Sequence, residues 1–175
     1  MRDGEAQPKN ETYEDKSEET CTPPDRAELC ASATTLEQAA SRNCLDRVSE
    51  LLSTNGLDSK KGLPSAALAT AIKLGFEPIA RLLIEKGAAV NPETNDEWLK
   101  PLVLAARWRR IGILQAIIKA GADVDQKDEN GITWLASYGV FDTRVSRILV
   151  EAGADANARD DHGATPLMHA SNYGY

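Results

Sequence analysis

A five-residue phrase, Gly-Ala-x-x-Asn/Asp, returns three times at nearly constant spacing. Its copies occupy residues 87–91, 121–125 and 153–157, so the glycines are 34 and then 32 residues apart. Each copy closes an apolar run of helical period, which suggests that one short unit is repeated. A single unit of this size cannot bury its hydrophobic face alone, whereas stacked copies share a continuous core. The sequence therefore predicts an elongated solenoid.

The residue pattern within one unit predicts two helices and a turn. Thr133 and Thr165 follow Gly-containing turns and are predicted to cap the amides of a short helix, with Pro166 in a first-turn position. An Ala-rich helix such as 102–106 lets neighbouring units approach closely. A second helix such as 79–84 carries the aliphatic stripe, and the glycine after it suits a left-handed C-terminal position.

These motifs resemble the ankyrin-repeat family. The likeness is strongest in Asp128-x-x-Gly131-x-Thr133 and in the run from Asp160 through Gly163 to Thr165-Pro166-Leu167. The resemblance implies an all-α solenoid of helix-turn-helix units with hairpin-like turns. We divide it into units at 34–57, 58–91, 92–125 and 126–157, plus the first helix of a fifth from 158 onward. The domain is thus expected to span 34–175, and the open fifth unit leads us to expect further chain beyond it.

Two departures from the family pattern predict local irregularity. The family usually has His after Thr-Pro-Leu, whereas His169 comes one residue late, so the usual Thr–His hydrogen bonding is expected to be missing. The fourth unit has Trp134 where the helix-start proline is expected. It also has Tyr138 and Gly139 where small helix residues pack. Because a large side chain in a small site forces the backbone to shift, we expect this unit to be distorted.

The first 33 residues differ in composition from the rest. They hold nine acidic and four basic side chains, and their only large aliphatic residue apart from Met1 is a single Leu. Such a segment cannot bury enough apolar surface to offset its chain entropy. We therefore expect a disordered acidic N-terminal segment over 1–33.

Charge and composition restrict the class of protein. The net charge of −7 argues against binding to nucleic acid or to an anionic membrane through bulk charge. No apolar run approaches the length of a membrane span, and no secretory leader is evident. Three cysteines, Cys21, Cys30 and Cys44, are too few and odd in number for a disulfide framework. These features favour an intracellular protein, cytoplasmic or nuclear, in a reducing compartment.

The sequence contains no set of residues at catalytic or metal-binding spacing. His162 and His169 have no acidic or thiol partner at metal spacing, and the common hydrolase, zinc and phosphate-loop motifs are absent. We therefore expect no enzyme activity, no cofactor and no small-molecule substrate. The run from Arg107 to Arg110, with Trp108 inside it, is the one candidate for stacking on nucleic acid. A single patch on an acidic chain favours protein contact instead.

Aligning the units predicts a row of side chains at the end of each first helix. Leu74, Trp108, Phe141 and Tyr173 take this position in units two to five, after Arg42 in unit one. We call these four residues the ladder. Aromatic and arginine side chains are enriched in binding hot spots. The alternative is that the ladder side chains pack between adjacent repeats.

The predicted function is therefore a scaffold or adaptor that binds a partner protein through the concave face of the array. The predicted contact residues are Leu74, Trp98, Leu99, Arg107, Trp108, Phe141, His162 and Tyr173. The alternative function is a substrate-recruitment or regulatory segment of a larger enzyme, such as a protein kinase or a ubiquitin ligase.

Overall fold

The computed structural model describes residues 23–54, 65–93, 100–139 and 142–173. These residues form ten helices and no strand, apart from an isolated antiparallel bridge between Lys127 and Thr133. After α1 (Pro23–Ala31), helices alternate between two positions in the repeat. The first-position helices are α2 (Leu36–Ser41), α4 (Ser65–Leu74), α6 (Pro101–Arg107), α8 (Trp134–Ser137) and α10 (Pro166–Asn172). The second-position helices are α3 (Leu45–Thr54), α5 (Glu77–Glu85), α7 (Ile111–Lys119) and α9 (Thr143–Glu151).

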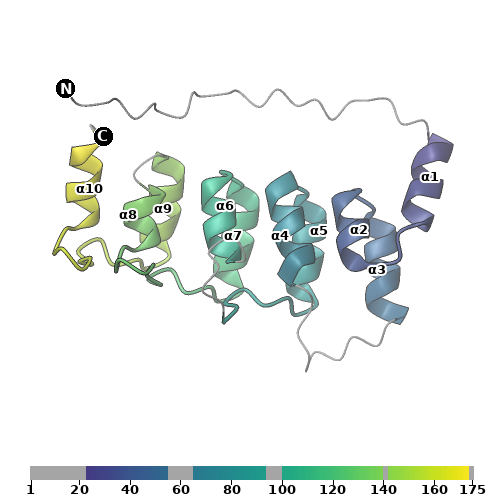
Figure 1. Cartoon of the computed structure of the whole chain (residues 1–175), viewed down its shortest axis with the longest axis horizontal. Helices are drawn as coiled ribbons and strands as arrows, with labels where there is room; N and C mark the ends of the chain where they lie inside the picture. Colours follow the sequence, from purple (N-terminus) through teal and green to yellow (C-terminus); the bar gives the residue numbers. More distant parts are fainter. Residues whose placement is uncertain (1–22, 55–64, 94–99, 140–141, 174–175) are drawn as a thin grey trace.

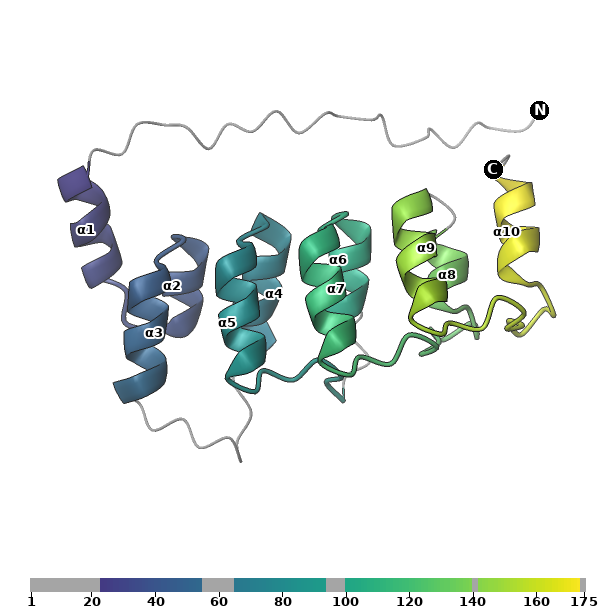
Figure 2. The same ribbon diagram turned by 180° about the vertical axis from the view of Figure 1, so that it is seen from behind.

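The helices stand in two parallel layers. Figures 1 and 2, taken from opposite sides, show the first-position helices side by side in one layer and the second-position helices in the other. Helices of one layer touch their neighbours in the next repeat, as α4 touches α6 and α5 touches α7, and each pair within a repeat also packs together. The predicted all-α solenoid is therefore confirmed.

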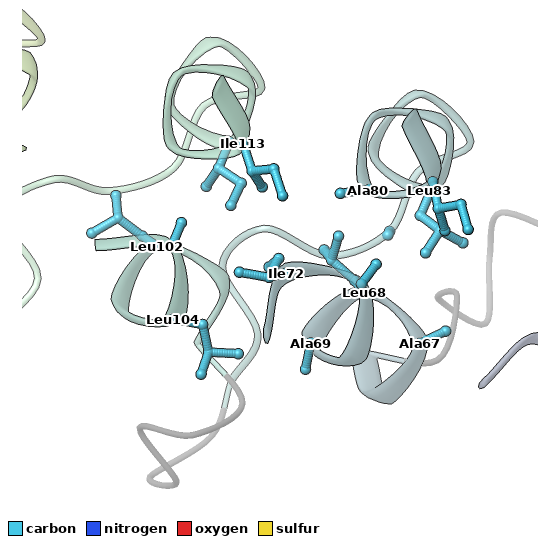
Figure 3. Close-up of a cluster of buried hydrophobic side chains, with 14 of the residues drawn as sticks. Ala67, Leu68, Ala69, Ile72, Ala80, Leu83, Leu102, Leu104 and Ile113 are labelled. Carbon is cyan, nitrogen blue, oxygen red and sulfur yellow. The ribbon is translucent and has the colours of Figure 1, made fainter. Parts of the chain in front are cut away.

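One hydrophobic core runs through the array between the layers. Figure 3 shows part of it, where Leu68 and Ile72 of α4 lie among side chains of α5, α6 and α7. Both residues are fully buried, as are Leu83 and Ile113. The first-position helices contribute many alanines, and Ala67 and others among them have no exposed surface. Small side chains allow these helices to approach closely, so the aliphatic residues of the second-position helices fill the space between the layers.

The glycine of the repeated phrase ends each second-position helix as predicted. Gly87, Gly121 and Gly153 have φ angles of +90°, +90° and +98°, directly after the last residue that caps α5, α7 and α9. A side chain at such an angle is strained, so glycine is the residue that can turn the chain there.

The last residue of the phrase joins one repeat to the next. The Asn91 side chain accepts a hydrogen bond from the Asp123 amide at 2.9 Å and donates one to the Gly121 carbonyl at 2.9 Å. In the following repeat, Asp125 accepts from the Asp155 amide at 2.8 Å. The Asn or Asp at this position therefore forms hydrogen bonds across the joint between repeats.

The fourth repeat is distorted, as its sequence predicted. Helix α8 is only four residues long and is capped by Tyr138, whereas α6 in the preceding repeat has seven residues. Trp134 is 1% exposed and its ring centroid lies 6.3 Å from that of Tyr138. A Cβ atom at Gly139 would lie 2.9 Å from Leu135 Cδ1 and 3.3 Å from Ser146 Cβ, so a larger residue here would require the Leu135 side chain to shift.

The N-terminal end departs from two expectations. Residues 23–31, inside the segment predicted to be disordered, form α1, which lies at the end of the row (Figure 1). The expectation that the cysteines remain unpaired is wrong, because Cys30 and Cys44 form a disulfide with a Cα–Cα distance of 5.5 Å. Counting cysteines could not show that α1 folds back onto the first repeat. The argument from cysteine usage to a reducing compartment therefore no longer holds. Residues 1–22, including Cys21, lie outside the described residues.

Candidate protein-interaction surface

The ladder position has the same backbone geometry in several repeats. Arg42, Trp108 and Tyr173 each cap the end of a first-position helix, with φ of −95°, −87° and −91° and ψ of 4°, 7° and 0°. Leu74 is the last residue of α4. The next residue is left-handed in each of the first three repeats, with φ of +56° at Asn43, +79° at Gly75 and +52° at Arg109. The ladder side chains therefore leave equivalent points of the fold.

The ladder side chains in the described residues are substantially exposed. Leu74 is 47% exposed, Trp108 42% and Tyr173 57%. They lie at the ends of first-position helices, at the edge of the array opposite the segments that connect successive repeats (Figure 1). Each side chain is thus half packed and half open. Phe141, the ladder residue of the fourth repeat, lies outside the described residues, and α8 ends before reaching that position.

Arginines beside the ladder hold neighbouring repeats together. Arg110 donates to the Lys73 carbonyl at 3.1 Å, and its guanidinium lies against Gly75, where an added Cβ would come within 2.6 Å of it. Arg109 Nε lies 3.6 Å from Asp142 Oδ2 in the next repeat. Hydrogen bonds from Arg144, together with the charge of Arg109, lower the pKa of Asp142. Two arginines of the suggested nucleic-acid patch are therefore engaged within the protein.

Of the remaining predicted contact residues, two can be placed. Arg107 is exposed at the end of α6, next to Trp108, and His162 is exposed at the turn before α10. Trp98 and Leu99 lie outside the described residues. Arg107 and Trp108 are therefore adjacent in the third repeat, whereas His162 lies two repeats further along, before the start of α10.

The turns that precede α8 and α10 are each held by an aspartate side chain. Asp160 Oδ1 accepts from the amides of His162 and Ala164, at 2.9 and 2.8 Å. Asp128 does the same one repeat earlier, with Asn130 at 2.9 Å and Ile132 at 2.8 Å. A turn tip fixed in this way presents its side chains without an entropic cost of ordering on binding.

His169 replaces the missing Thr–His contact by another route. Its Nε2 lies 2.9 Å from Asp160 Oδ2, and both side chains are largely buried. The hydrogen bond from His169, followed by the amide bonds, lowers the pKa of Asp160. Although the histidine comes one residue late, it still reaches the turn from its own helix. The pair therefore closes the turn onto α10 and has a structural role.

A buried lysine is a feature that sequence reasoning missed. Lys100 is only 9% exposed, and its ammonium lies 5.3 Å from the centre of the Trp134 ring, a cation–π arrangement. Lys100 precedes Pro101 where Thr165 precedes Pro166, and Trp134 takes the proline position in the next repeat, so the two unusual residues of adjacent repeats contact each other. The sequence offered one indication of this contact: Lys takes the capping position of one unit, and Trp takes the proline position of the next.

The described part of the chain contains no group of His, Cys, Asp and Glu able to hold a metal ion. None of the helices found there is long and apolar enough to cross a membrane. What the surface does offer is a row of half-exposed apolar and aromatic groups on a rigid frame.

Comparison with known proteins identifies the fold family. A family model of ankyrin repeats, containing three copies, matches residues 36–128, which is more than half of the chain. The chain therefore belongs to the ankyrin-repeat family, whose repeats are non-catalytic modules for protein–protein interaction. No curated protein was found to match it.

Proposed function

We propose that this chain is a scaffold or adaptor that binds another protein through the edge of the array carrying Leu74, Trp108 and Tyr173. One observation carries the proposal: large apolar side chains are 42–57% exposed at one equivalent position in three repeats. Other large apolar side chains on these helices are packed inside, since Leu104 and Leu68 are fully buried. Packing between the helices therefore does not account for the exposure of the ladder residues. Half-buried aromatic groups held on a rigid frame are typical of binding hot spots.

The arrangement of the ladder residues supports a partner that contacts several repeats at once. Equivalent positions in adjacent repeats face the same way, so a partner can engage several of them along the array. Arg107 adds a positive charge next to Trp108, and an acidic group on the partner would complement it. Because the frame is already ordered, little binding energy is lost in ordering it.

The test is a double substitution with a matched control. In Leu74→Ala/Trp108→Ala, truncating two central contacts should weaken capture of partner proteins about tenfold or more. Leu29→Ala/Leu45→Ala removes two apolar groups that are 43% and 40% exposed on α1 and α3 and do not belong to the ladder, so capture should be unchanged. Helical circular dichroism should be preserved in both variants. Equal capture by both double variants would contradict the proposal.

A further inference from the structure

The edge of the array that carries the ladder is basic, although the chain as a whole is acidic. This ladder edge is formed by the turns that join each first-position helix to the second-position helix after it. In the first three repeats these turns are residues 42–46, 73–77 and 107–111, which hold five basic and two acidic side chains. The hairpin-like turns at the opposite edge, 121–133 and 153–165, hold seven acidic and two basic side chains. The two edges therefore have opposite charge.

The positive charge of the ladder edge is not used up by contacts within the fold. Arg42 and Arg110 each donate to a backbone carbonyl, at 2.7 and 3.1 Å, and a neutral acceptor leaves the guanidinium charge uncompensated. Lys73 is exposed beside the ladder residue of its repeat. Of the two acidic residues, Glu77 is already paired with Arg81 at 2.8 Å. The ladder edge therefore presents net positive charge next to its exposed apolar side chains.

The N-terminal segment has the complementary chemistry. Residues 1–22 hold seven acidic and three basic side chains, and four of the acidic ones fall within residues 14–19. Directly before them comes Tyr13, the single aromatic residue of the segment. An acidic run that adjoins an aromatic ring matches a surface on which basic side chains flank Leu74 and Trp108, because the charges attract and the rings can stack.

The N-terminal segment joins the array at the ladder edge. Helix α1 is held to the first repeat there, since Arg26 donates to the Asn43 carbonyl at 3.3 Å and the disulfide joins Cys30 to Cys44. Figures 1 and 2 show α1 at the end of the row, with its N-terminal end on the ladder side. The chain before α1 therefore starts beside the basic turns and away from the acidic hairpin-like turns.

The length of the segment fits a path along the ladder. Packed helices lie about 8–10 Å apart, so the three steps from α1 past α2 and α4 to α6 cover roughly 24–30 Å. An extended chain of ten residues, from Pro23 back to Tyr13, spans at most about 33–36 Å. Such a path would place Glu18 and Glu19 over the first two repeats and Tyr13 near Trp108.

We propose that residues 13–19 bind the ladder edge of their own chain, with the acidic side chains beside Lys73 and Tyr13 against Trp108. The tether makes a weak contact sufficient, because a short link gives an effective concentration on the order of millimolar. The bound segment would cover the ladder and compete with a partner protein. That consequence rests on the proposed function, whereas the contact itself does not.

The test uses NMR spectra of the full-length chain, in which the Trp108 indole N–H and the amides of residues 73–75 report on the ladder edge. Glu18→Gln/Glu19→Gln removes two charges from the acidic run and should shift these signals, because the segment is released. The amides of the hairpin-like turns should not move. Tyr13→Ala should shift the Trp108 indole signal as well.

Two controls separate a specific contact from a general effect of charge. Asp3→Asn/Glu5→Gln removes the same charge from the same segment but outside residues 13–19, and it should leave the ladder-edge signals in place. About 1 M salt reduces the Debye length to about 3 Å. It should therefore move the ladder-edge signals of the unmodified chain toward their positions in Glu18→Gln/Glu19→Gln.

Three outcomes would overturn the proposal. The first is unchanged ladder-edge signals in Glu18→Gln/Glu19→Gln while the circular dichroism stays normal. The second is an equal shift in Asp3→Asn/Glu5→Gln, which would mean that bulk charge and not residues 13–19 is responsible. The third is a shift that grows with protein concentration, which would assign the ladder edge to the segment of a second copy. None of these measurements uses a partner, so failure here is distinct from unchanged capture by the ladder variants.

Discussion

The first and last helices of the described array differ in how they are held and covered. At the N-terminal end, α1 is tied down by the Cys30–Cys44 disulfide and by Arg42, which donates to the Leu29 carbonyl at 2.7 Å and to Ser32 Oγ at 2.8 Å. At the C-terminal end, Leu167 of α10 is 73% exposed. Because a repeat contacts only its neighbours, the stability of an end depends on what covers it. The array should therefore open first at α10.

The largest expected effect compares matching leucines inside the array and at its open end. Leu102→Ala leaves a cavity between α6 and α7 and should lower the free energy of unfolding by about 2–5 kcal/mol. Leu167→Ala, at the same place in α10, should change it by about 0.5 kcal/mol or less. Urea unfolding followed by circular dichroism measures both. Similar losses in the two variants would mean that α10 is covered after all.

A smaller effect is expected at the closed end. The disulfide joins residues separated by 14 positions, and a loop of that length corresponds to about 3 kcal/mol in the chain-entropy model. Cys30→Ser should therefore loosen α1 and reduce the amide-exchange protection of the first repeat, and a reductant should do the same to the unmodified protein. Cys21→Ser is the matched control and should leave both unchanged. Protection of α1 that survives reduction would show that Arg42 and packing suffice to hold it.

The smallest effect concerns acid at the open end. The pKa of Asp160 is lowered from 3.8, so its charge stabilises the folded state above that pH, and this stabilisation is lost as the pH falls toward the lowered value. We expect the His162 and Ala164 amides to lose exchange protection at acidic pH before the amides of the interior repeats do. Asp160→Asn should remove this pH dependence, whereas Asp161→Asn, on the neighbouring exposed acid, should retain it. Unchanged acid sensitivity in Asp160→Asn would rule out this carboxylate as the cause.

Sequence predicted those parts of the fold that local chemistry determines. The Gly-Ala phrase placed the left-handed turn at Gly121, and the large residues in the fourth unit predicted that it is distorted, which the four-residue helix α8 confirms. Both follow from steric demands of single residues. The Cys30–Cys44 bond and α1 did not follow, because a composition poor in apolar residues is typical of disorder and the helix is held by contacts with the first repeat.

The candidate site was only partly predictable for the same reason. Register alone identified Leu74, Trp108 and Tyr173 as equivalent, since equivalence follows from the repeat. It could not tell which neighbours the adjacent arginines would reach. Arg109 lies at a left-handed turn position, with φ of +52°, and its contact with Asp142 depends on how two adjacent repeats are stacked. The pairing of Lys100 with Trp134 likewise arises only when the repeats are stacked.

The bonds made by Asn91 and Asp125 have a mechanical consequence. Each bond crosses a single joint and links one repeat to the following one. Tension along the long axis would load every joint equally and the weakest would open first, so we expect the molecule to extend in steps of one repeat. A partner that spans two repeats would then reinforce only the joint that it bridges.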